Sequence, residues 1–162
     1  MNDTINPIRK TDEEAIILSR KLITETRYSA LGVKEIETGV PLVSRIAIAF
    51  SQETGLFFCA SDLSVHSKSL LQDAACSLLL GERGTGDGLA YPRITVIGNA
   101  SRLPNDTSHR PLLREVFLKS HPKAELYIDF TDFGFYPVEI ERAQLNGGFG
   151  KAYHLSREEL RF

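Results

Sequence analysis

The sequence predicts a mainly β protein of the α+β class, in which six antiparallel strands form a closed or partly closed barrel with flanking helices. Six short segments alternate apolar and polar residues or are continuously apolar, as strands are. The first three follow one another through short turns, which indicates antiparallel pairing. A barrel also removes the exposed edges that an open sheet would leave. With 162 residues, 42% of them hydrophobic, the chain suits one packed core, so we expect a single domain over residues 1–162.

The N-terminal region predicts an arm and then a helix. Residues 1–10 are expected to form a loose arm. Thr11 and Glu14 have the T-x-x-E spacing of a capping box, and apolar residues then recur at helical spacing. We therefore expect a helix over about residues 12–26 that covers one end of the sheet.

The remaining elements follow in order. The expected strands cover about residues 27–36, 41–50, 56–61, 74–82, 91–103 and 134–147. The expected further helices cover about residues 64–73, 107–120 and 122–130. Gly98 interrupts a strand and predicts a bulge or bend there. Residues 147–162 are expected to be a tail, with a glycine-rich turn and a short terminal helical segment.

Composition excludes several classes of protein. The net charge of −2 provides no broad positive field, so we expect neither a nucleic-acid nor a membrane partner. No apolar run approaches the length of a membrane span, and the first residues resemble no targeting segment, so a soluble cytoplasmic protein is expected.

The cysteines and histidines predict no metal cluster. Cys59 and Cys76 lie in apolar segments without paired spacing and are expected to be buried free thiols. The four histidines are far apart in the sequence, and none forms an H-x-H or H-x-x-x-H pair: His66, His109, His121 and His154.

Hydroxyl and basic side chains gather where the second and third expected strands meet the following helix. They are Ser44, Arg45, Ser61, Ser64, His66, Ser67 and Lys68. A helix N-terminus has unpaired N–H groups and a dipole that favours anions. If the two strands pair around residue 53, Arg45 and Ser61 lie nearly opposite each other. The sequence therefore favours a phosphate site, with Arg93 at the entrance of a later strand as a further cationic residue.

Each of these residues also has an ordinary structural alternative. The alternatives are a helix cap for Ser61 and Ser64, a solvated charge for Lys68, a polar helix position for His66, and an ion pair with Glu35 or Glu53 for Arg45.

The sequence also resembles a known family. The segments that carry the resemblance are PLVSRIAIAF, SDLSVHSKSLLQD, CSLLLGE, YPRITVIGNASRL and HPKAELYIDFTDFGFYPVEIERAQLNGGFGKA. Together they are similar to the flavin-binding split barrels related to pyridoxamine 5′-phosphate oxidase, and among these to the branch of the haem-utilisation proteins. The resemblance covers residues 20–152 and implies a Greek-key split barrel.

The resemblance implies FMN as the cofactor, and a homodimer with a flavin at the subunit interface. The implied FMN-binding residues are Ser44, Arg45, Ile46 through its backbone, Ser61, His66, Lys68 and Arg93. An FMN-dependent oxidoreductase of undetermined small-molecule substrate is therefore the first hypothesis, since the flavin would supply the redox chemistry. A related deazaflavin is a further possible cofactor.

Two alternatives stay open. One is a haem-binding or haem-degrading protein, with His154 as the better candidate for an axial ligand and His121 as the other. The other is a flavin-binding module without turnover. The chain lacks the C-terminal Arg-x-His of the true oxidases, so oxidation of pyridoxamine phosphate is not expected.

Overall fold

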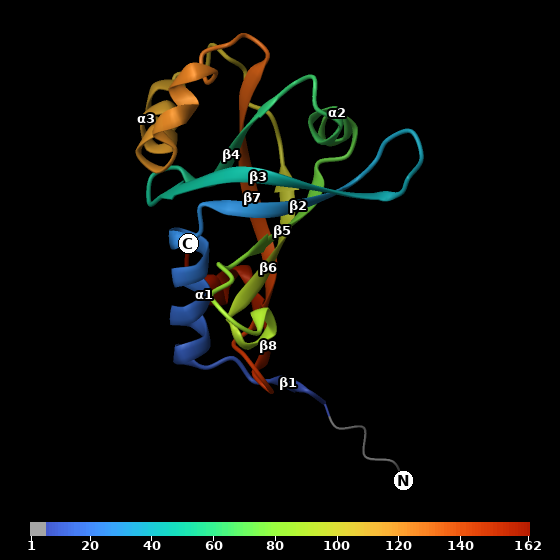
Figure 1. Cartoon of the computed structure of the whole chain (residues 1–162), viewed down its shortest axis with the longest axis vertical. Helices are drawn as coiled ribbons and strands as arrows, with labels where there is room; N and C mark the ends of the chain where they lie inside the picture. The colour runs from blue at the N-terminus through green and yellow to red at the C-terminus, as the bar shows by residue number, and fades with distance from the viewer. Residues whose placement is uncertain (1–5) are drawn as a thin grey trace.

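Six antiparallel strands close into a barrel in the computed structural model, which describes residues 6–162 (Figure 1). The barrel strands are β2 (Tyr28–Lys34), β3 (Pro41–Ser51), β4 (Gly55–Ser61), β5 (Ala75–Leu80), β6 (Arg93–Ala100) and β7 (Phe133–Asn146). Around the barrel each strand pairs with the next in the order β6, β7, β4, β3, β2, β5 and back to β6. The predicted fold class is therefore confirmed.

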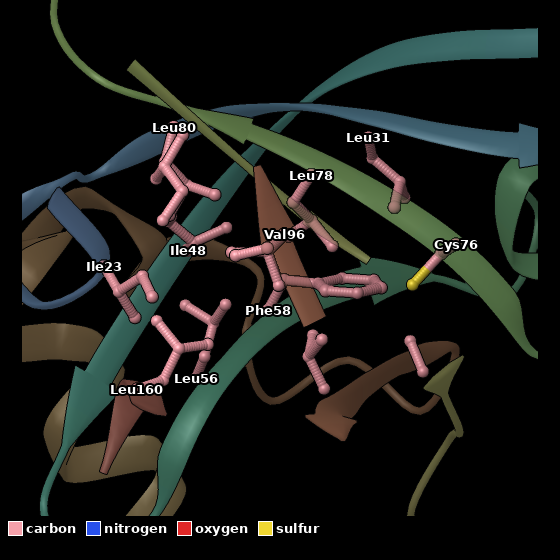
Figure 2. Packing of buried hydrophobic residues seen from close by; sticks show 14 of the residues in the cluster. Ile23, Leu31, Ile48, Leu56, Phe58, Cys76, Leu78, Leu80, Val96 and Leu160 are labelled. Atoms are coloured by element: carbon pink, nitrogen blue, oxygen red, sulfur yellow. The ribbon is translucent and has the colours of Figure 1, made fainter. Parts of the chain in front are cut away.

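The barrel interior is a continuous apolar core. Alternate residues of the strands point inward, and Figure 2 shows side chains such as Ile48, Leu78 and Val96 converging between the strands. At the centre the rings of Phe58 and Tyr136 are stacked, with centroids 4.9 Å apart and planes 2° apart. Both residues are fully buried, so this pair joins β4 to β7 through the middle of the core.

A bulge bends the β6–β7 ladder. The register shifts between Ile97 and Gly98, where the sequence predicts it. A Cβ atom at Gly98 would lie 2.0 Å from the carbonyl oxygen of Glu139, so only glycine allows the two backbones to approach this closely.

Helix α1 (Glu13–Glu25) contributes Ala15, Ile16 and Ile23 to the barrel core. With Thr11 as the N-cap, as expected, the helix would begin at residue 12, but it begins at Glu13. The capping prediction was wrong: Asp12 is the N-cap, and its carboxylate accepts a hydrogen bond of 2.8 Å from the backbone N–H of Ala15.

Helices α3 (Arg110–Ser120) and η2 (Pro122–Leu126) cover part of the outside of the barrel. They form a second apolar cluster against β3, β4 and β7, with Phe57, Phe117, Ile128 and Phe135 among its members. The other helices are α2 (Val65–Gln72), η1 (Gly88–Ala90) and α4 (Arg157–Leu160).

Two short strands extend the sheet beyond the barrel. β8 (Ala152–Ser156) pairs antiparallel with the last residues of β7, and β1 (Ile8–Arg9) pairs parallel with β8. Part of the expected tail is therefore a strand, and so are residues 8–9 of the expected loose arm. Residues 1–5 of that arm lie outside the described residues. The cause is the length of β7, whose 14 residues leave its final part free to pair on both sides.

Candidate functional site

An open groove of about 660 Å³ lies on the outer face of β2, β3 and β5. Its lining residues are Tyr28, Ser29, Ala30, Val43, Ser44, Arg45, Leu79, Gly81 and Glu82. In the strand register, Ala30 of β2 pairs with Arg45 on one side and with Leu79 on the other. Because alanine is small, the floor between the Arg45 and Leu79 side chains is low and can accommodate a flat ligand.

Arg45 is the cation of this groove. Its side chain is exposed, and it forms no hydrogen bond or ion pair with any residue in the range 6–162. The alternative pairings with Glu35 and Glu53 are therefore not formed. An unpaired guanidinium beside apolar side chains is suited to a carboxylate or phosphate of a ligand.

Ser44 and Ile46 are the neighbours of Arg45 in β3. Ser44 is half-buried and lines the groove, whereas Ile46 is 6% exposed and packs in the barrel core. The side chain of Ile46 therefore belongs to the core, and only its backbone remains available for the predicted cofactor contact.

The remaining predicted residues on β4 and α2 lie outside the groove. Ser61 donates a hydrogen bond of 2.6 Å to the Asp132 carboxylate and accepts one of 3.1 Å from the N–H of Leu63. His66 is half-buried, and burial lowers the pKa of its imidazole, so the neutral form is favoured. Lys68 is exposed on α2.

The expected juxtaposition of Arg45 with Ser61 was wrong. The register around residue 53 is as predicted, since Ile48 pairs with Phe58 and Ser51 with Gly55. The ladder ends at Ile48 and Phe58, however, because the two strands separate there and take other partners. Arg45 pairs with β2 and Ser61 with β7.

Arg93 lies in a second hollow, of about 400 Å³, that adjoins the groove. Its guanidinium donates hydrogen bonds to the carbonyl oxygens of Leu89, at 3.2 Å, and Tyr91, at 3.4 Å. In the single chain Arg93 therefore supports the 81–92 loop beside the groove.

A polar cluster that the sequence does not predict holds the turn before α2. The Arg102 guanidinium binds the Asp62 carboxylate through two hydrogen bonds, of 2.6 and 2.9 Å, and the Tyr136 hydroxyl lies 3.4 Å from the same carboxylate. The hydrogen bond to Asp62 raises the pKa of Arg102. Because Asp62 and Arg102 are 40 residues apart, no spacing rule could have paired them.

The two histidines considered as haem ligands differ in access. His121 is 6% exposed, its Nε2 lies 2.8 Å from the Ile48 carbonyl oxygen, and its ring packs against Tyr28 and Phe117. Burial lowers the pKa of its imidazole. His121 is thus part of the packed interior, whereas His154 is exposed on β8, outside the groove.

Both cysteines are free, as expected. Cys76 is buried and Cys59 is partly buried, and burial raises the pKa of each thiol to about 12.

Within residues 6–162, no group of three or more His, Cys, Asp or Glu side chains is arranged to hold a metal ion. Nor is any helix of this range long and apolar enough to cross a membrane.

The closed six-stranded antiparallel barrel, with its helices and its open outer groove, defines a protein of the split-barrel class. The chain belongs to the CREG β-barrel family, whose family model matches residues 10–160.

Comparison with known proteins adds relatives whose names refer to haem. The chain is 31% identical over 125 residues to the non-canonical heme oxygenase HOZ, chloroplastic, of Arabidopsis thaliana. These aligned residues make up 75% of this chain and 37% of that protein. A solved heme binding protein from Mycobacterium smegmatis is 25% identical, with a TM-score of 0.81 over 94% of this chain and 61% of the other. The chain therefore spans less than two thirds of either relative.

The fold alone is shared more widely. A Clostridium acetobutylicum protein described as related to general stress protein 26, of the pyridoxinephosphate oxidase family, has a TM-score of 0.70 at 14% identity, over 93% of this chain and 99% of the other. The resemblance to split barrels of the oxidase and haem-utilisation type is thereby confirmed.

Proposed function

We propose that this chain binds haem in the groove on β2, β3 and β5, as a haem-binding or haem-degrading protein. The observation that carries the proposal is the unpaired Arg45 guanidinium beside a low floor at Ala30 and the exposed apolar side chains of Val43 and Leu79. Haem is flat and apolar with carboxylates at one edge, so its ring fits such a floor and its carboxylates fit the guanidinium. The names of the two relatives with 31% and 25% identity support the same choice.

An FMN-dependent oxidoreductase is the second candidate. Ser44 and Arg45, two of the residues predicted to bind FMN, both line the groove. Against it, Lys68 lies outside the groove and the Ser61 hydroxyl already donates to Asp132, so one chain gathers few of the donors that a phosphate dianion requires.

Absorption spectroscopy tests the proposal. Haem titrated into the purified protein should give a shifted Soret band that saturates at one haem per chain, and haem should displace any FMN bound at the same groove. A protein that binds FMN but gives no Soret shift would support the second candidate instead. Because His154 lies outside the groove, the shifted band should persist in His154→Ala, and Tyr28 is then the groove side chain that would ligate the iron.

Arg45→Ala should weaken cofactor binding about 10- to 150-fold. The change removes a charge-assisted hydrogen bond, which contributes about 1.5–3 kcal/mol. The measurement is the dissociation constant for haem, with Arg142→Ala, an exposed arginine of β7 outside the groove, as the matched control. Equal affinities of the wild type and Arg45→Ala would place the cofactor elsewhere.

The groove region also provides a surface for a second copy of the chain. Three large side chains that line the groove are exposed, Tyr28 by 53%, Val43 by 67% and Leu79 by 46%. In a homodimer this face would be covered, and the ring of the cofactor would be sheltered from water.

Val43→Glu should therefore convert a dimer into a monomer, because a charge would be buried in the centre of the interface. Sedimentation velocity at micromolar concentration measures the change. Leu126→Glu, at an 80% exposed position on η2, is the control and should remain dimeric. A monomeric wild type would contradict this part of the proposal.

A further inference from the structure

Glu82 lies where the groove and the adjoining hollow meet. Three residues line both, and they are Leu79, Gly81 and Glu82. Glu82 is the acidic residue among those that line the groove, and it is exposed. It forms no hydrogen bond or ion pair with any residue of the range 6–162.

The backbone fixes the position of Glu82. Gly81 has a φ of +126°, and a Cβ atom there would lie 2.7 Å from the carbonyl oxygen of Pro92. The chain therefore leaves β5 in a direction that other residues would not allow. This close approach holds the next residue, Glu82, at the junction.

The charged side chains that line the groove are one cation and one carboxylate. Arg45 is the cation that lines the groove. The adjoining hollow adds Arg83, Asp87 and Arg93, but the Arg93 guanidinium already donates to two backbone carbonyls. An anion bound at Arg45 thus shares the groove with a carboxylate.

We propose that Glu82 is a specificity-determining residue, which makes the groove select against phosphorylated cofactors. The proposal rests on the groove being the cofactor site. A phosphate carries between one and two negative charges at neutral pH in a small volume, so an opposing carboxylate penalises it more than it penalises an uncharged group. The groove would then favour a ligand whose anionic groups are carboxylates, each with a single negative charge, or a ligand without a phosphate.

Flavins with and without a phosphate test the proposal directly. The probes are FMN and riboflavin, which share the ring and differ in the phosphate, and the measurement is the ratio of their dissociation constants by fluorescence titration. Glu82→Gln should shift this ratio towards FMN by about 3- to 5-fold at low ionic strength, as expected for a partly exposed charge. Glu82→Lys should shift it further, and both effects should shrink in high salt.

Glu53→Gln is the matched control, since it makes the same charge change in the β3–β4 turn and should leave the ratio unchanged. An unchanged ratio in both Glu82 variants, a ratio that Glu53→Gln shifts equally, or no flavin binding by any variant would overturn the proposal. Haem titration of the same samples tests the proposed function separately. A shifted flavin ratio without haem binding would refute haem and retain the role of Glu82.

Discussion

Phe58→Ala is expected to lower the free energy of unfolding by about 3–5 kcal/mol, the largest effect of any substitution considered for this chain. Phe58 is fully buried and stacks on Tyr136, and its removal leaves a cavity between β4 and β7 in the centre of the barrel. Removal of the ring loses the favourable free energy of transferring it from water into the core, and the neighbouring side chains lose their van der Waals contacts with it.

Chemical denaturation followed by circular dichroism measures this loss. The control is Phe149→Ala, which removes the same atoms from a side chain that is 78% exposed and should change stability by less than about 0.5 kcal/mol. Equal stabilities of the two variants would show that the stacked pair is not at the centre of a packed core.

Gly98→Ala is expected to lower the free energy of unfolding by about 3 kcal/mol, at the upper end of the range for overpacking. The new methyl group would lie 2.0 Å from the Glu139 carbonyl oxygen, a backbone atom that cannot move without disrupting the bulge between β6 and β7. The strain therefore falls on the ladder that closes the barrel.

Gly32→Ala is the matched control, because Gly32 also lies in a barrel strand. A Cβ atom there would meet its nearest neighbour, the Ser77 carbonyl oxygen, at 3.7 Å, which is an ordinary contact. Thermal unfolding of both variants should show a clear loss of Tm for Gly98→Ala alone. A similar Tm for the two would mean that the bulge relaxes without cost.

Much of the barrel could be predicted because its signals are local. The alternation in each strand and the turn at Gly55, whose φ is +66°, determine the pairing of β3 with β4, and Gly98 indicates its bulge. β8 was missed because its pairing depends on how far β7 extends past β6, and a five-residue strand beside a glycine-rich turn has little local signal.

The candidate site was predicted in part for the same reason. The strand that carries Ser44 and Arg45 was predicted because local patterns determine it and its neighbours, and both residues line the groove. The end of the β3–β4 ladder, which separates Arg45 from Ser61, and the pairing of Asp62 with Arg102 depend on contacts between distant segments. Sequence spacing contains no information on either.

The length of β7 has a consequence for synthesis of the chain. Its partners β4 and β6 are both made before it, and β8 after it, so β4 and β6 emerge from the ribosome with hydrogen-bonding edges that have no partner until residues 133–146 follow. The nascent chain must keep these edges apart from other chains over that interval. Stalling translation just before residue 133 should therefore yield an aggregation-prone product that binds chaperones, whereas stalling after release of residue 156 should yield a closed barrel.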